Sequence, residues 1–447
     1  MKYNSLSVII LAAGKGSRMK SDLPKVMHKV AGCEMLNHVI NNAKSLSPKN
    51  INLILSYDMM QYKDYISSCH SEIEIKYILQ QDPKGTGHAI KVTLENIKKQ
   101  DLGQDIVVLY ADTPLLKPLT IAKLVDNLSQ NDISVAAFSH DKDNMYGRLI
   151  IDDNNNLCKI VEFKDATLDQ KSIKICNSGI ITFSAKAISS LIDNLTNNNA
   201  AKEYYLTQLI EIANDNNLKC GYEIIKYNEV IGVNNKIELA YIEEIFQQEI
   251  SHKLMSQGVT IINPKSCYFA YDVKIGKNCI IYPNIFIDNN VEIKDNVTIN
   301  SFSHIEGAII GDNAIIGPFA RIRPQTLISD NCKIGNFVEI KKSTISKEVK
   351  ISHLSYIGDS EIEENSNIGA GVVTCNYDGK KKFKTKIGKN NFIGSNTSII
   401  APLVTGDNVM IGAGSVINKD VNDGNLAIAR AKQVNLKKNY LNNDKKS

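Results

Sequence analysis

The sequence predicts two different folds in one chain of 447 residues: an α/β domain with a mostly parallel sheet, followed by a β-solenoid. Up to about residue 235, short β-rich runs alternate with amphipathic stretches of helix length, which is typical of a parallel sheet covered by helices. From about Val259 onward, isoleucine recurs at every sixth residue. Between the two patterns, Lys236–Met255 mixes spaced apolar residues with charged ones and predicts one long helix.

The first part is a Rossmann-like alternation of strands and helices. The expected strands are Val8–Leu11, Asn52–Ser56, Ile75–Leu79, Ile106–Tyr110 and Ser134–Phe138. The expected helices are Asn37–Ser45, Ala89–Gln100 and Leu119–Ser129. We therefore divide the chain into a first domain (1–236), a helical linker (237–257) and a second domain (258–447).

The second part is defined by its period of six. Isoleucine stands at positions 275, 281, 287, 293, 299 and 305 and, after a slip of one residue, at 310, 316, 322, 328, 334 and 340. An α-helix cannot place every sixth residue on one face, because it has 3.6 residues per turn. A triangular coil with one short strand per side can, since each repeat then directs one aliphatic side chain inward. Two unbroken runs of this length exclude chance, and they predict a solenoid of hexapeptide repeats.

Composition narrows the class of partner and the compartment. Lys and Arg number 52 against 48 Asp and Glu, a net charge of +4 that gives no reason to expect nucleic acid or a membrane surface as the main partner. No apolar run approaches the roughly 20 residues of a membrane span. The nine cysteines are scattered, with no CxxC pair, so we expect free thiols rather than disulfides or a zinc site. These features predict a cytoplasmic protein.

A glycine-rich segment after the first strand is the first candidate site. It runs from Leu11 to Met19, and Pro24-Lys25 follows shortly after it. Glycines let the backbone come close to a phosphate, and successive N–H groups can point at it. Arg18 and Lys25 add the cations that a triphosphate requires. The segment matches neither the dinucleotide fingerprint nor a Walker loop, and by itself it also fits a plain glycine turn.

Further polar motifs follow later strands. Asp112 stands at the C-terminal end of an apolar strand, where parallel sheets bind ligands, which makes it a candidate Mg²⁺ ligand. Asn234 offers an amide oxygen as a second ligand. Gln80 with the turn Gly85–His88, and the loops around Gly147, Glu162 and Asn177, are candidate nucleotide and specificity loops, although each one singly is more often a simple turn.

Taken together, these motifs resemble the sugar-nucleotide pyrophosphorylases. The solenoid adds the segments 339–342, 353–359, 367–371, 374–379 and 392–395. Both halves in this order are similar to the GlmU family, the bifunctional N-acetylglucosamine-1-phosphate uridyltransferase/glucosamine-1-phosphate N-acetyltransferases. The resemblance implies a nucleotidyltransferase domain, a left-handed parallel β-helix and a homotrimer assembled through that helix. It also implies synthesis of UDP-N-acetylglucosamine from UTP, acetyl-CoA and glucosamine 1-phosphate with Mg²⁺, a product that feeds peptidoglycan, lipopolysaccharide and lipid A synthesis.

In the first domain, the resemblance implies that Arg18 and Lys25 catalyse uridylyl transfer and that Asp112 and Asn234 bind the metal. The residues expected to bind the nucleotide or its sugar are Leu11, Ala12, Ala13, Gly14, Lys25, Gln80, Gly85, Thr86, Tyr110, Ala111, Asp112, Gly147, Glu162, Asn177 and Asn234. Two residues depart from the family's pattern. Ser17 replaces a threonine and keeps its hydroxyl, and Ala111 replaces a glycine, which leaves position 111 as a backbone contact at most.

In the solenoid, His353 is the expected general base, because a near-neutral imidazole can take the proton of an attacking amine. Glu339 is expected to orient it or to stabilise its charge. The expected glucosamine-1-phosphate residues are Arg323, Lys341, Tyr356, Asn367 and Lys382, and the expected acetyl-CoA residues are Ala370, Asn376, Tyr377, Ser395, Ala413 and Arg430. The lysine-rich tail 437–447 is expected to be solvated surface, with attraction of coenzyme A phosphates as the alternative.

Two other readings stay open at this point. One is a single-function sugar-phosphate nucleotidyltransferase with a regulatory hexapeptide domain, which would not require His353 with Asn376 and Tyr377. The other is a non-catalytic assembly subunit, which would be free to lose Arg18 and Lys25.

Overall fold

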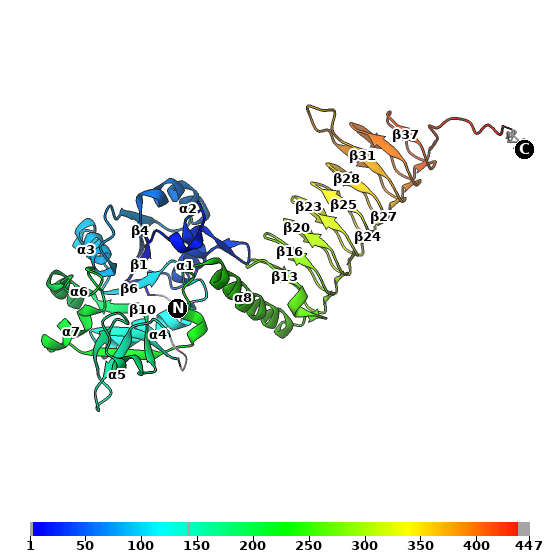
Figure 1. Ribbon diagram of the computed structural model, residues 1–447. Helices are drawn as coiled ribbons and strands as arrows, with labels where there is room; N and C mark the ends of the chain where they lie inside the picture. Colours follow the sequence, from blue (N-terminus) through cyan, green and yellow to red (C-terminus); the bar gives the residue numbers. More distant parts are fainter. Residues whose placement is uncertain (1–2, 141–143, 437–447) are drawn as a thin grey trace, which may run out of the picture. The chain divides into compact units, whose positions relative to one another are not determined.

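The computed structural model describes residues 3–140 and 144–436, so the lysine-rich tail lies outside the described residues (Figure 1). The chain divides into two compact units, Met1–Phe246 and Gln247–Ser447. The helix α8 (Lys236–Ser256), expected as Lys236–Met255, contains the boundary between them. In the described part of the chain, no helix has the length and apolar character needed to cross a membrane. All nine cysteines are free thiols, as expected.

The first unit is built on one mixed sheet with the strand order β11-β7-β10-β6-β1-β4-β5 (Figure 1). These strands are β1 (Leu6–Ala12), β4 (Asn50–Leu55), β5 (Ile75–Leu79), β6 (Asp105–Tyr110), β7 (Ile133–Ser139), β10 (Ile175–Ser184) and β11 (Cys220–Ile224). The strand β1 lies parallel between β4 and β6, whereas β10 is antiparallel to both β6 and β7. The predicted α/β fold is confirmed. The antiparallel β10 and the hairpin of β8 (Arg148–Ile151) and β9 (Leu157–Val161) were not predicted.

Helices cover both faces of this sheet. They are α1 (Met35–Lys44), α2 (Lys63–Cys69), α3 (Thr86–Asn96), α4 (Pro118–Asp126), α5 (Leu168–Lys171), α6 (Ala185–Leu191) and α7 (Gln208–Asp215). In β1, Val8 and Ile10 join a core with residues of α1 and α4, whereas Ile9 joins a second core with residues of α3, α6 and α7. Because side chains alternate along a strand, one buried strand serves both cores. A small hairpin, β2 (Lys29–Val30) and β3 (Cys33–Glu34), precedes α1.

The second unit is a parallel β-helix of stacked coils (Figure 1), in which every third strand joins the same sheet except the last one, which joins the first sheet one strand early. The first solenoid sheet contains β12 (Thr260–Ile261), β15 (Ile280–Ile281), β18 (Thr298–Ile299), β21 (Ile315–Ile316), β24 (Lys333–Asn336), β27 (Lys350–His353), β30 (Asn367–Ile368), β33 (Phe392–Ile393), β36 (Met410–Ile411) and β38 (Leu426–Ala427). The second contains β13 (Tyr268–Phe269), β16 (Phe286–Ile287), β19 (His304–Ile305), β22 (Arg321–Ile322), β25 (Glu339–Lys341), β28 (Tyr356–Gly358), β31 (Val373–Cys375), β34 (Ser398–Ile400) and β37 (Val416–Ile417). The third contains β14 (Lys274–Ile275), β17 (Glu292–Ile293), β20 (Ala308–Ile310), β23 (Thr326–Ile328), β26 (Thr344–Ile345), β29 (Ser360–Ile362), β32 (Thr385–Ile387) and β35 (Leu403–Thr405).

Each six-residue repeat forms one side of a coil, so three repeats complete a turn and bring the isoleucines of successive coils into register. Ile299, Ile316, Ile334 and Ile351 pair in successive coils of the first sheet, and none of them is exposed. Each isoleucine therefore packs on its equivalents and seals the interior. Many corners between sheets hold asparagine with positive φ, a backbone conformation that asparagine tolerates better than most residues. The hexapeptide fold is confirmed, and between β31 and β32 the insertion 376–384 interrupts it.

Candidate active sites

The glycine-rich segment of the first unit leaves β1 and turns sharply into a 3₁₀ turn, Ser17–Met19. Gly16 has a φ of 60°, and a Cβ atom there would lie 2.5 Å from the Cβ of Lys25. Only glycine allows this backbone conformation and this approach together. The loop and Lys25 are thus held in direct contact.

Four predicted residues meet beside this loop. The Lys25 ammonium pairs with Asp112 and lies 3.3 Å from Oδ1 of Asn234. Arg18 donates to the same Oδ1 at 2.9 Å. Glu238 accepts from the amide nitrogen of Asn234, which leaves the Asn234 oxygen facing the two cations. The side chains come from the ends of different elements, at the edge of the sheet where parallel strands bind ligands.

A cavity of about 320 Å³ adjoins this cluster. The predicted residues that line it are Leu11, Ala12, Ala13, Gly14, Lys25, Gln80, Gly85, Thr86, Tyr110 and Asp112. Pro83 and Glu203 also line it and were missed, because nothing in their local sequence distinguishes them from ordinary loop residues. Ala111 does not line the cavity: its side chain is fully buried, and its N–H donates to the carbonyl of Leu11 at 3.1 Å.

Gly147, Glu162 and Asn177 form a second group in the same unit. The N–H of Asn177 donates to the carbonyl of Gly147 at 2.8 Å, and a Cβ atom at Gly147 would lie 3.4 Å from Oε2 of Glu162. Thr207 donates to Oε1 of Glu162 at 2.9 Å. Burial raises the pKa of Glu162, while the hydrogen bond from Thr207 opposes that shift.

Tyr110 connects this group with the cavity. A Cβ atom at Gly179, next to the Asn177 turn, would lie 2.8 Å from the Tyr110 ring. Burial, with the carboxylates of Glu162 and Asp112 nearby, raises the pKa of the Tyr110 hydroxyl. The phenol therefore stays protonated and can donate a hydrogen bond.

The chemistry of Asp112 and Asn234 fits a divalent ion that is held in part by substrate. Within residues 3–140 and 144–436, no cluster of three or more His, Cys, Asp or Glu side chains could enclose a metal. Mg²⁺ is often bound by one or two protein oxygens together with substrate phosphates and water, rather than by a cage of protein ligands. One carboxylate and one amide beside the cavity match that kind of site.

The site in the solenoid is built around His353. This residue ends β27 at the corner between the first and second sheets, and its Nδ1 lies 2.6 Å from Oδ1 of Asn336 in the preceding coil. Because the amide oxygen can only accept, the bond places the proton on Nδ1 and leaves Nε2 free to accept another. Glu339, the residue expected to orient His353 or to stabilise its charge, does not hold the ring. Instead, Glu339 accepts from Arg323 at 2.8 Å, and Asn336 contacts the ring.

Three cations gather at the opposite corner of the second sheet. Arg323 follows β22, Lys341 ends β25, and Lys382 comes from the insertion 376–384. The pKa of the Lys341 ammonium is lowered, chiefly by Lys382 and less by Arg323, because nearby like charges disfavour its charged form. Glu339 neutralises only part of this charge, so the corner is suited to an anion. Tyr356 stands on β28 beside Glu339 in the register, on the face between this corner and His353.

The predicted acetyl-CoA residues Ala370, Ser395, Ala413 and Arg430 follow one corner of the coils. The N–H of Gly371 donates to the carbonyl of His353, and the N–H of Asn396 to that of Ala370. The N–H of Gly414 donates to the carbonyl of Ser395, and Arg430 donates to that of Ala413 at 2.5 Å. The four residues thus form a track that leads away from His353.

Asn367 is not brought to the second sheet. It lies on the first solenoid sheet between Lys350 and Phe392, whereas Tyr356 is on the second. Asn376 and Tyr377 begin the insertion. The side chain of Asn376 is buried, and that of Tyr377 is exposed.

An α/β unit whose cavity is lined by Lys25 and Asp112, followed by a hexapeptide solenoid with its own histidine site, defines a transferase of two activities. Residues 8–202 match the family model of the MobA-like NTP transferase domain, and residues 384–419 match the bacterial transferase hexapeptide. Residues 304–378 match the C-terminal domain of GMPPB. These matches cover parts of both units.

Relatives match nearly the whole chain. Bifunctional protein GlmU of Zymomonas mobilis is 41% identical over 440 residues, which cover 97% of this chain and 96% of the relative. Bifunctional protein GlmU of Wolbachia pipientis is 41% identical over 426 residues, covering 95% and 97%. The chain belongs to the GlmU family. This membership confirms the prediction of a bifunctional uridylyltransferase and N-acetyltransferase of UDP-N-acetylglucosamine synthesis, and it excludes the reading with a merely regulatory solenoid.

Among solved structures, HddC from Yersinia pseudotuberculosis complexed with GMP-PN covers 54% of this chain and 99% of its own length, at 23% identity and a TM-score of 0.41. At this level of similarity we infer nothing from it.

Proposed function

We propose that the first unit transfers a uridylyl group from UTP to N-acetylglucosamine 1-phosphate at the cavity beside Lys25. A phosphate oxygen of the sugar phosphate forms a bond to the α-phosphorus, the bond from that phosphorus to the bridging oxygen breaks, and pyrophosphate leaves. The meeting of Arg18, Lys25, Asp112 and Asn234 supports this assignment most directly. Such a reaction needs positioning and neutralisation of charge more than covalent help from the protein.

Each group of residues in and beside the cavity then has a role. Leu11 to Gly14, Gln80, Gly85 and Thr86 hold the uridine and its phosphates. Gly147, Glu162 and Asn177 hold the amino sugar. Arg18 and Lys25 stabilise the transferring phosphoryl group. Mg²⁺, held by Asp112 and Asn234, would supply further neutralisation of phosphate charge. Lys25, whose ammonium pairs with Asp112 in this structure, would be available to the phosphates if Asp112 held the ion.

We propose that the second unit acetylates glucosamine 1-phosphate on the face between His353 and the three cations. The sugar phosphate binds Arg323, Lys341 and Lys382, which leaves its amine toward His353. As the amine nitrogen forms a bond to the thioester carbonyl of acetyl-CoA, Nε2 of His353 takes its proton. The carbon–sulfur bond then breaks, and coenzyme A leaves as the thiol after receiving that proton. The track from Ala370 to Arg430 holds acetyl-CoA.

We further propose a homotrimer of solenoids and a cytoplasmic location. Asn367 and Tyr356 lie on different sheets, so a contact of both with one sugar, as the family resemblance implies, would need a second copy; this supports an oligomer, and the family resemblance supplies the number three. Light scattering coupled to size-exclusion chromatography measures the mass directly, and a monomeric mass would contradict the trimer. The free cysteines fit a reducing compartment.

Two assays on the purified protein test the assignment of sites. One follows pyrophosphate release from UTP and N-acetylglucosamine 1-phosphate, and the other follows free thiol from acetyl-CoA and glucosamine 1-phosphate. We expect Asp112→Ala to abolish only the first activity and His353→Ala only the second. If each substitution abolishes both activities in folded protein, the proposal of two separate sites is wrong.

A further inference from the structure

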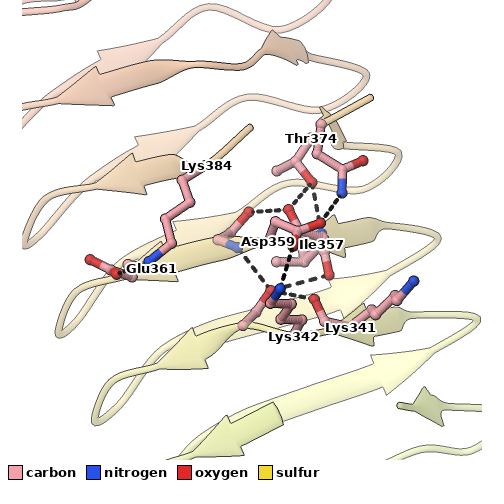
Figure 2. Close-up of polar contacts among 11 residues, drawn as sticks. Lys341, Lys342, Ile357, Asp359, Glu361, Thr374 and Lys384 are labelled. Carbon is pink, nitrogen blue, oxygen red and sulfur yellow. Dashed lines mark hydrogen bonds and ion pairs between the residues drawn. The ribbon is translucent and has the colours of Figure 1, made fainter. Parts of the chain in front are cut away.

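Asp359 is a buried carboxylate that no role in catalysis accounts for. It follows β28 at the same corner as the three cations, is 7% exposed and has a φ of 48°. We propose that Asp359 is a positioning residue for acetyl transfer: it clamps both ends of the insertion 376–384 and so sets the place of Lys382 and Tyr377. Figure 2 shows Asp359 among its polar contacts, near Lys341 and Lys342. The inference relies on the roles proposed above for those two residues.

The clamp joins three coils at one residue. The side chain of Asp359 accepts a hydrogen bond from Nδ2 of Asn376, the first residue of the insertion, at 2.5 Å. Its carbonyl accepts from the N–H of Thr385, directly after the insertion, at 3.2 Å. Its own N–H donates to the carbonyl of Lys341 at 3.0 Å. One residue therefore ties the start and the end of the insertion to the coil that carries Lys341.

The side-chain bond is buried on both sides. Asn376 is 6% exposed, and Lys342 Nζ stands 4.0 Å from the other Asp359 oxygen as a partly exposed counter-charge. A buried donor that loses its acceptor pays the full cost of its desolvation, so the insertion has a strong preference for this position. Nδ2 of Asn376 thus anchors the start of the insertion.

Beyond the clamp, the insertion is a small ordered hairpin. The N–H of Phe383 donates to the carbonyl of Asn376 at 2.8 Å, and Tyr377 bridges to Lys382. The Asp378 carboxylate accepts from the N–H groups of Lys380 and Lys381 at 2.8 and 2.6 Å. Because the hairpin is closed on itself, it moves as a unit, and its base decides where Lys382 lies relative to Lys341.

Glu361 provides a matched control. It lies on β29, two residues after Asp359, and also pairs with a lysine at the end of the insertion, Lys384, at 3.4 Å (Figure 2). Both of these side chains are exposed, so the pair contributes little to the position of the insertion. Replacing Glu361 removes a carboxylate two residues away from Asp359 without removing a buried acceptor.

The first test is limited proteolysis with trypsin, which has three consecutive target lysines in the hairpin, Lys380 to Lys382. Mass spectrometry of the fragments gives the rate of cleavage at these lysines. We expect that rate to be at least about tenfold higher in Asp359→Ala than in the wild type or in Glu361→Ala. Asp359→Asn keeps an oxygen that can accept from Asn376 and should restore most of the protection. Cleavage of Asp359→Ala at the control rate would overturn the proposal.

The second test is kinetic. In Asp359→Ala the KM values for glucosamine 1-phosphate and acetyl-CoA should rise by about tenfold while uridylyl transfer is unchanged, and unchanged KM values would also contradict the proposal. If trypsin instead cuts Asp359→Ala throughout 258–436, the solenoid has unfolded. Asn376→Ala, which removes the other partner of the bond, is then tested in its place, with the same expected rise in the rate of cleavage at Lys380 to Lys382. The wild type could lack acetyl transfer while trypsin still cuts the hairpin faster in Asp359→Ala. That result would contradict the proposed function and leave the proposal about Asp359 intact.

Discussion

The Nδ1 atom of His353 lies 2.6 Å from Oδ1 of Asn336, and the two residues are register partners on β27 and β24. A general base needs a fixed ring and a free nitrogen, and this contact provides both. The pairing follows directly from coil length, because the two residues are 17 positions apart, one turn of the solenoid.

We therefore expect Asn336→Ala to lower the kcat of acetyl transfer by about tenfold, a part of what a general base typically contributes, with little change in KM. The reason is that the imidazole loses the acceptor that fixes its tautomer and orientation. Thiol release from acetyl-CoA measures this directly. Lys333→Ala, at the exposed other end of β24, is the control and should leave kcat unchanged. Equal kcat values in the wild type and Asn336→Ala would contradict the role of Asn336.

Lys382 should contribute chiefly to binding of the sugar phosphate. A hydrogen bond to a charged group contributes about 1.5–3 kcal/mol, so Lys382→Met should raise the KM for glucosamine 1-phosphate by roughly tenfold to a hundredfold. Steady-state kinetics at low ionic strength gives this value. Lys380→Met removes an equal charge from the same hairpin, where the Lys380 N–H bonds Asp378, and should change KM by less than twofold. A similar rise in both variants would show that only the net charge of the hairpin matters.

Gly16 and Gly14 should respond differently to alanine. At Gly16 the added Cβ meets Lys25 at 2.5 Å and the positive φ is strained, so Gly16→Ala must displace the loop or Lys25. We expect kcat/KM for uridylyl transfer to fall on the order of a hundredfold, as displacements of about 1 Å cause in active sites. Acetyl transfer should be unaffected.

Gly14 lines the cavity, and a Cβ atom there meets nothing within 4 Å. Gly14→Ala should therefore keep the melting temperature while raising the KM for UTP, since the methyl group occupies space meant for substrate. If Gly16→Ala retains wild-type uridylyl transfer, the contact between the loop and Lys25 is not required for the reaction.

Much of the fold could be predicted because it depends on local patterns. The period of six implies the stacking of Ile299 on Ile316, and the position of Asp112 after an apolar strand implies its place at the sheet edge. The contact of Arg18 with Asn234 joins residues 216 positions apart, and only the combination of motifs indicated it. Asn336 could have been found by counting one coil back from His353.

Other features depend on tertiary packing that leaves no local signal. The strand β10 reads like any apolar strand, and its antiparallel direction follows from how the hairpin β8–β9 returns to the sheet. Glu203 reaches the cavity from a loop with no motif of its own. The clamp of Asp359 on Asn376 depends on where the insertion leaves the coil, which the spacing of the isoleucines does not reveal.

His70 should make the stability of the first unit depend on pH. Burial, with Lys44 nearby, lowers its pKa from 6.5 to about 4, and Nε2 contacts Oδ1 of Asn37 at 3.1 Å. Between pH 6.5 and 4 the unfolded chain binds a proton on this residue that the folded chain does not. The free energy of unfolding therefore rises with pH across this window, and this contribution is lost as the pH falls below 6.5.

His70→Gln removes the titration and keeps an amide N–H for Asn37. Differential scanning calorimetry of the full chain at pH 7 and pH 5 should show the wild type losing more melting temperature than His70→Gln in the transition of the first unit. Other buried histidines such as His38, whose pKa burial also lowers, titrate equally in both proteins, so the difference between the two isolates His70. An identical loss in both proteins would mean that His70 is protonated without cost and that its burial does not control the acid stability of this unit.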